Sequence, residues 1–181
     1  MTWNVFKGKL EYRGIEYRGK AEEFAKIAAL PRRFGRPFRI AVGGTEAPLA
    51  DLANQGWAAE DGPSATLTPE DYQDYLAASR GEVSVAKNVY VALKTGWFST
   101  RSACYLAASR PVVVQDTRFS NILPTGCGLH AFATADEAAA AIETVEANYE
   151  AEMRAARDLA LAHFDARQVL SRLIEDAFAA S

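Results

Sequence analysis

The sequence predicts an α/β fold, namely a single Rossmann-like domain with a mainly parallel sheet, helices on both faces and a helical C-terminus. Short apolar runs typical of strands alternate with stretches of helical periodicity. The run Val112–Val114 is apolar without alternation, which favours a strand covered on both faces. Beyond Thr134, nearly all of the chain has the periodicity of helices. Together these observations favour a doubly wound α/β domain.

The composition narrows the class of protein before any motif is considered. A chain of 181 residues fits one domain, and a net charge of −3 argues against a nucleic-acid binder. No apolar run approaches the roughly 20 residues of a membrane span. The N-terminus lacks the apolar core of a secretory signal, so a cytoplasmic protein is expected. The two cysteines and two histidines do not have the spacing of metal ligands, and no metal is expected.

Residues 1–37 are expected to form an N-terminal arm and helix, packed on a domain that spans residues 38–181. In the arm, the sequence EYRG occurs twice in close succession, which suits a hairpin or an extended segment. Helical spacing from Lys20 to Leu30 predicts a helix, and Pro31 is expected to end it before a basic turn.

Within the domain, apolar runs that suit strands alternate with helix-start signals. The expected strands are Phe38–Val42, Trp57–Ala59, Glu82–Ala86, Val112–Val114 and Leu129–Ala133. Thr68-Pro69 opens one helix with acidic residues behind it. Thr134 opens another, with Glu137 at the spacing of a capping box. The helical C-terminus is expected to break near Asp165.

The stretch Gly96–Thr117 carries the strongest functional signal. Ser99 or Thr100 can cap a helix whose first turn holds Arg101, and such a helix N-terminus attracts anions. The next strand ends in the polar run QDT, and open α/β sheets bind ligands at the carboxyl ends of their strands. The pattern predicts a bound phosphate group at this edge of the sheet.

Taken in order, these stretches resemble the C-terminal, donor-nucleotide-binding half of a GT-B glycosyltransferase. The resemblance rests on FRIAVGG, EVSVAK, GWFSTRSACYLAASRPVVVQDT and the capped helix TADEAAAAI. It covers roughly Phe38 to Phe178, about three quarters of the chain. It implies sugar transfer from a nucleotide-sugar donor, without a metal or another cofactor. A GT-B enzyme needs two domains, so it also implies little activity without an acceptor-binding domain or partner subunit. Apolar surface left by that missing half would favour a homo-oligomer.

The same resemblance implies roles for residues at the strand ends and at the helix start. The donor-phosphate contacts would be Arg101, Ser99, Thr100, Lys87, Gly43 and Gly44, and the sugar or nucleotide contacts Asp116 and Thr117. Arg101 would make a forked contact with the diphosphate; alternatively it pairs with a carboxylate such as Asp116. The serine and threonine alternatively serve only as helix caps, and Lys87 as a solvated surface residue. Asp116 and Thr117 alternatively end the strand and cap the next turn. No catalytic residue is assigned.

Some positions depart from the family pattern. Many retaining enzymes of this class carry two glutamates around the helix, whereas the matching positions here hold Gly96 and Cys104, and Ser109 replaces the turn glycine. These departures favour an alternative, a non-catalytic Rossmann-like interaction or binding domain that has lost the donor site. A flavodoxin-like binding or regulatory module is a third interpretation, but its acidic cluster at the first strand end is absent. His130 is expected to be a hydrogen-bonded structural residue.

Overall fold

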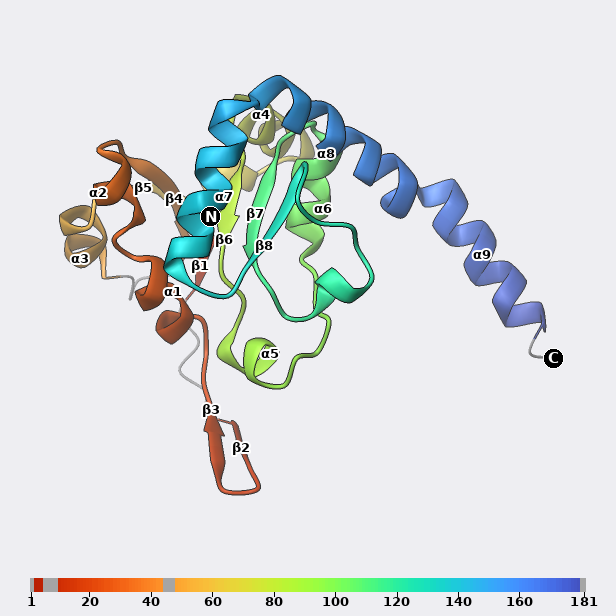
Figure 1. Cartoon of the computed structure of the whole chain (residues 1–181), viewed down its shortest axis with the longest axis horizontal. Helices are drawn as coiled ribbons and strands as arrows, with labels where there is room; N and C mark the ends of the chain where they lie inside the picture. The colour runs from red at the N-terminus through yellow and green to blue at the C-terminus, as the bar shows by residue number, and fades with distance from the viewer. Residues whose placement is uncertain (1, 5–9, 44–47, 180–181) are drawn as a thin grey trace.

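The strands pair in two small parallel sheets (Figure 1). The computed structural model describes residues 2–4, 10–43 and 48–179. One three-stranded sheet has the order β1-β4-β5 and the other the order β6-β7-β8. Their bounds are β1 Thr2–Asn4, β4 Phe38–Gly43, β5 Trp57–Asp61, β6 Glu82–Ser84, β7 Val112–Gln115 and β8 Leu129–Phe132. All predicted strands are present, but their pairing makes two sheets rather than the single sheet that was predicted, and β1 was not predicted.

The N-terminal arm contains a hairpin that projects from the body of the molecule (Figure 1). Strands β2 (Leu10–Tyr12) and β3 (Ile15–Tyr17) pair in antiparallel fashion. Arg13 and Gly14 make the turn with φ values of 53° and 75°. Positive φ at both central residues suits the right-handed twist of a two-residue hairpin, and glycine tolerates it without strain. The first EYRG copy therefore supplies the turn, and of the two predicted alternatives the described part of the arm, residues 10–17, forms the hairpin.

Pro31 begins a helix rather than ending one, so the prediction for this position was wrong. Helix α1 (Ala21–Ile27) stops early, and a second short helix α2 (Leu30–Phe34) includes the proline in its first turn. The first N–H groups of a helix have no intrahelical partner, so proline costs nothing there. Half of the segment predicted as a basic turn, Arg32 to Pro37, is therefore helical, and the helix is capped by Gly35 with φ 61°.

Two of the remaining helices begin at the predicted caps. The bounds of the remaining helices are α3 Leu49–Asn54, α4 Pro69–Ala78, α5 Asn88–Ala92, α6 Thr100–Ala107, α7 Ala135–Ala147, α8 Tyr149–Phe164 and α9 Ala166–Ala179, with short 3-10 turns η1 Ser64–Thr66 and η2 Phe119–Asn121. Thr68 and Thr134 both form complete capping boxes. The helical C-terminus breaks at Asn148 as well as at the predicted Asp165.

Strand β7 lies between two apolar clusters, which confirms that both of its faces are covered. Val113 belongs to a cluster with side chains of β4, β8, α1 and α7. Val112 and Val114 belong to a second cluster with side chains of α6 and α8. Successive side chains of a strand point to opposite faces, so a continuous valine run can fill both clusters.

Helix α9 extends away from the sheets (Figure 1). Every described residue of this helix is exposed. Its exposed large apolar side chains are Val169, Leu170, Leu173, Ile174 and Phe178. Of the described helices, none is long and apolar enough to cross a membrane.

Candidate functional site

Helix α6 begins where strands β6 and β7 end, which is where the sequence predicted an anion site. Residues from the ends of both strands line a cavity here together with Trp97, Ser99 and Arg101. Its volume is only about 10 Å³, close to the least space that can accept one water molecule. Of the predicted contact residues, Ser99 and Arg101 line this cavity, and a diphosphate has no open cleft there in this conformation.

Arg101 points inward and is bound to a glutamate that sequence reasoning did not identify. Its Nε donates to Glu82 Oε1 at 2.6 Å, and its Nη2 donates to Ser84 Oγ at 2.9 Å. Ser102 Oγ donates to the other carboxylate oxygen of Glu82 at 2.6 Å. Burial disfavours the charged guanidinium, but the Glu82 carboxylate outweighs this and raises the pKa of Arg101. The sequence analysis gave two alternatives for Arg101, and pairing with a carboxylate was one of them, with Asp116 as the example. The structure shows Glu82 instead. Glu82 is the acidic residue that opens the apolar run EVSVA, and this was the signal that was missed.

The helix start itself is free of side-chain capping. Ser99 occupies the cap position in extended conformation, but its hydroxyl makes no cap hydrogen bond. Thr100 is the first helical residue and is exposed. The role of Ser99 as a side-chain cap is therefore not realised, while its hydroxyl borders the small cavity.

The polar residues after β7 hold the neighbouring loops in place. Asp116 Oδ1 accepts a hydrogen bond from Arg118 N at 2.8 Å, and Oδ2 accepts one from Ser120 Oγ at 2.9 Å. Thr117 is 1% exposed and donates its hydroxyl to Trp97 O at 2.6 Å. Both residues fit the alternative in which they end the strand and organise the next turn.

The other predicted contacts lie at the ends of β4 and β6. Lys87 precedes helix α5, and its Nζ lies 5.9 Å from the centre of the Tyr90 ring. Gly43 is the last residue of β4. Gly44 falls outside the described residues. Gly43 thus lies at the carboxyl end of a parallel strand, and Lys87 lies three residues after the carboxyl end of β6.

A second buried polar cluster lies beside the first. Glu23, 1% exposed, accepts hydrogen bonds from Lys26 Nζ at 2.6 Å, from Asn88 Nδ2 at 2.9 Å and from Gln115. Burial acts to raise the pKa of Glu23, but these hydrogen bonds prevail and lower it. Nearby, Lys20 Nζ donates to the hydroxyl of Ser84, the serine that also binds Arg101. Burial, followed by the charge of Arg101, lowers the pKa of Lys20 to about 7.

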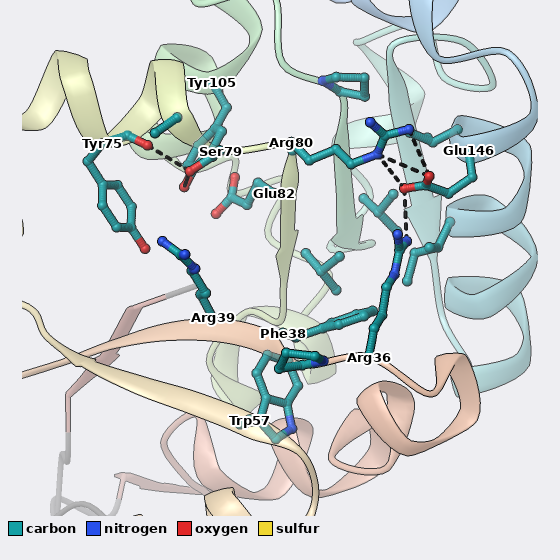
Figure 2. A pocket seen from close by; sticks show the side chains of 18 residues that line it. Arg36, Phe38, Arg39, Trp57, Tyr75, Ser79, Arg80, Glu82, Tyr105 and Glu146 are labelled. Carbon is teal, nitrogen blue, oxygen red and sulfur yellow. Dashed lines mark hydrogen bonds and ion pairs between the residues drawn. The ribbon is translucent and has the colours of Figure 1, made fainter.

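A larger cavity lies at the opposite, amino-terminal ends of the strands (Figure 2). It measures about 370 Å³ and is lined by the first residues of β4, β5 and β6. Arg36 and Arg80 converge on Glu146, with N–O distances of 2.9 and 2.8 Å. Hydrogen bonds from Arg80, and then from Arg36, lower the pKa of Glu146. Sequence reasoning placed no function at this edge, because ligands of open α/β sheets normally bind at the carboxyl ends.

Outside these regions, His130 has the structural role that was predicted. Its Nε2 lies 2.8 Å from Glu152 Oε2, which also accepts the Gly128 N–H at 2.6 Å. Among the residues that the structure describes, no group of three or more histidine, cysteine or acidic side chains could hold a metal ion. No protein-family model matches the chain, and no curated protein matches it.

Proposed function

We propose that this chain is the nucleotide-sugar-binding half of a GT-B glycosyltransferase, which transfers a sugar from a nucleotide diphosphate donor. The observation that carries the proposal is the order of the strands within two parallel sheets. Numbered along the chain without the hairpin, the strands have the order 3-2-1 in one sheet (β5-β4-β1) and 4-5-6 in the other (β6-β7-β8), and every pair is parallel. With β1 beside β6, the two sheets would give the 3-2-1-4-5-6 order of nucleotide-binding folds. In such folds the nucleotide lies at the carboxyl ends of the strands, near the point where the order reverses.

Helix α6 supplies the chemistry for the diphosphate in this proposal. Its N-terminus abuts the carboxyl ends of β6 and β7, and a helix start combines unpaired N–H donors with the positive end of the helix dipole. Ser99 and Thr100 add hydroxyl donors, and Lys87, three residues after β6, adds a positive charge. Arg101 acts differently from the role first assigned to it: its contacts with Glu82 and Ser84 position the first turn of α6 against β6.

The proposed domain works together with a partner. Catalysis takes place between two domains in GT-B enzymes, so the chain alone is expected to transfer little sugar until an acceptor-binding domain or partner subunit is added. The exposed apolar row of α9 supports such a partner, because rows of this kind are normally covered.

A second candidate is a non-catalytic interaction or binding domain that has lost the donor site. Two observations favour it. The guanidinium expected to face the diphosphate is already paired with Glu82, and the cavity at the start of α6 has room for no more than about one water molecule.

A thermal-shift panel separates the two candidates. UDP, GDP, ADP, CMP and TDP are each added at millimolar concentration to the full chain. A ligand at 100 times its Kd stabilises the folded state by about 2.7 kcal/mol. At ~2–4 °C per kcal/mol, the melting temperature should rise by roughly 5–11 °C.

The variant Ser99→Asp tests the position of the site. Aspartate is as good a helix cap as serine, so the fold should be preserved, but its carboxylate repels a phosphate at the start of α6. Thr68→Asp, at the cap of α4, is the matched control. A shift that Ser99→Asp abolishes and Thr68→Asp retains supports the donor site. A shift that survives Ser99→Asp places the ligand elsewhere, and no shift with any nucleotide favours the second candidate.

A further inference from the structure

Trp97 is a large aromatic side chain that stays exposed near the carboxyl ends of β6 and β7. It is 41% exposed and lies in the loop between α5 and α6, two residues before the cap position of α6. The next residue, Phe98, packs inward, with its ring centre 5.1 Å from that of Phe119 and 5.5 Å from that of Phe164. The loop therefore buries one aromatic ring and leaves its neighbour in contact with solvent, at the edge of the sheet where ligands of open α/β folds bind.

Hydrogen bonds fix the backbone on both sides of this ring. The Thr117 hydroxyl donates to Trp97 O at 2.6 Å, and the Gly96 N–H donates to Thr117 O at 2.7 Å. The Trp97 N–H donates to Thr95 Oγ1 at 3.3 Å. Lys94, in the same loop, has φ 52°, a conformation that costs energy for a residue with a Cβ and that is concentrated at functional sites. The loop thus holds an exposed ring in one place despite backbone strain.

The indole is also supported by a second ring. Trp97 stacks on Tyr90 of α5, with 5.0 Å between the ring centres and 21° between the ring planes. Lys87 Nζ lies 5.9 Å from the centre of the Tyr90 ring, and its charge disfavours a cationic ligand on this pair of rings. A rigid, flat and partly exposed ring suits a second flat, uncharged ring, because aromatic rings attract one another in offset stacks. Nucleobases bind to exposed aromatic side chains in this way.

We propose that Trp97 is the stacking platform for the nucleobase of the donor. The presence of a nucleotide rests on the proposed function, and the new step is the place of its base. Trp97 and Ser99 line the same small cavity, so a base on the indole would lie beside a diphosphate at the start of α6. Because every base has a flat face, the platform would hold the base without selecting which base it is.

The test compares ligands that carry a base with one that does not. Isothermal titration calorimetry measures the binding of ADP, UDP, adenosine and inorganic pyrophosphate to the full chain and to its variants. Removal of one base–aromatic stack lowers affinity by about 5- to 150-fold. Trp97→Ala should therefore weaken ADP and UDP by such a factor and leave pyrophosphate unchanged. Trp97→Phe, which keeps a flat ring, should retain most of the affinity.

Two further variants serve as references. Leu93→Ala removes another exposed apolar side chain of the same loop, 48% exposed, and should change no affinity. Ser99→Asp places a carboxylate at the start of α6 and should weaken ADP, UDP and pyrophosphate alike, but not adenosine. Thermal melting followed by circular dichroism checks that each variant is folded.

Each outcome separates the platform from the donor site. A loss of ADP and UDP affinity in Trp97→Ala, with pyrophosphate unchanged, supports both. Nucleotide binding that Trp97→Ala leaves unchanged, or that falls equally for pyrophosphate, overturns the platform and leaves the donor site standing. Adenosine binding that Trp97→Ala removes, without any effect of Ser99→Asp on ADP or UDP, supports the platform and overturns the diphosphate site. Absence of binding by all four ligands overturns both.

Discussion

Replacing Arg101 with methionine tests whether its buried ion pair with Glu82 holds the fold together. Arg101 is 20% exposed and the Glu82 side chain 0%, with 2.6 Å between Nε and Oε1. Methionine keeps much of the volume and apolar stem of arginine but removes the charge and its hydrogen bonds. The variant therefore leaves a buried carboxylate without its cation.

Removing one member of a buried pair typically costs about 3–5 kcal/mol, because the remaining charge is desolvated and uncompensated. Ser102 still donates to Glu82 at 2.6 Å, so we expect a value near the lower end, roughly 3 kcal/mol. At ~2–4 °C per kcal/mol for a chain of this size, the melting temperature should fall by about 6–12 °C.

Urea denaturation at pH 7, followed by circular dichroism, measures the loss. Arg33→Met is the matched control, because Arg33 and Asp136 form an exposed pair at 2.7 Å that should contribute about 1 kcal/mol or less. Adding Glu82→Gln to Arg101→Met should recover part of the stability, since the buried charge is then removed as well. A cost for Arg101→Met no greater than that for Arg33→Met would refute this account of the pair.

Two further predictions concern Lys20 and Gly128. The pKa of Lys20 is about 7 in the folded state against 10.5 ordinarily. Below pH 7 the side chain is protonated in both states, and burying this charge destabilises the fold. As the pH rises from about 7 to 10.5, the folded state loses the proton first, so this destabilisation is relieved. The unfolding free energy of the natural chain should therefore rise relative to Lys20→Met across that window, by up to about 1.4 kcal/mol per pH unit, and a constant difference in urea titrations would contradict it. Gly128 has φ 71°, and a Cβ there would overlap the backbone of α8 at Ala156. Gly128→Ala should thus lower the free energy of unfolding by at least about 2 kcal/mol more than Gly126→Ala, because a Cβ at Gly126 meets no atom within 4 Å. Equal losses in urea titrations would show that α8 can move to make room.

The sequence predicted the helix starts and the buried strand well, because the interactions that define them join residues close together in the chain. The capping boxes at Thr68 and Thr134 formed as expected, since a hydroxyl three residues from its N–H partner needs no tertiary contact. The all-valine start of β7 likewise predicted burial on both faces. The prediction that Pro31 ends a helix was wrong, because proline is favoured both in the first turn of a helix and just after the end of one.

The sequence by itself determined the α/β class, the strands and the candidate residues at their carboxyl ends. Only the tertiary structure decided which partners those residues meet. Glu82 and Arg101 lie on different elements, so their pairing depends on how α6 packs against β6 rather than on any local pattern. The same is true of the division into two sheets, because strand pairing joins residues far apart in the chain and is set by the global packing of the apolar faces.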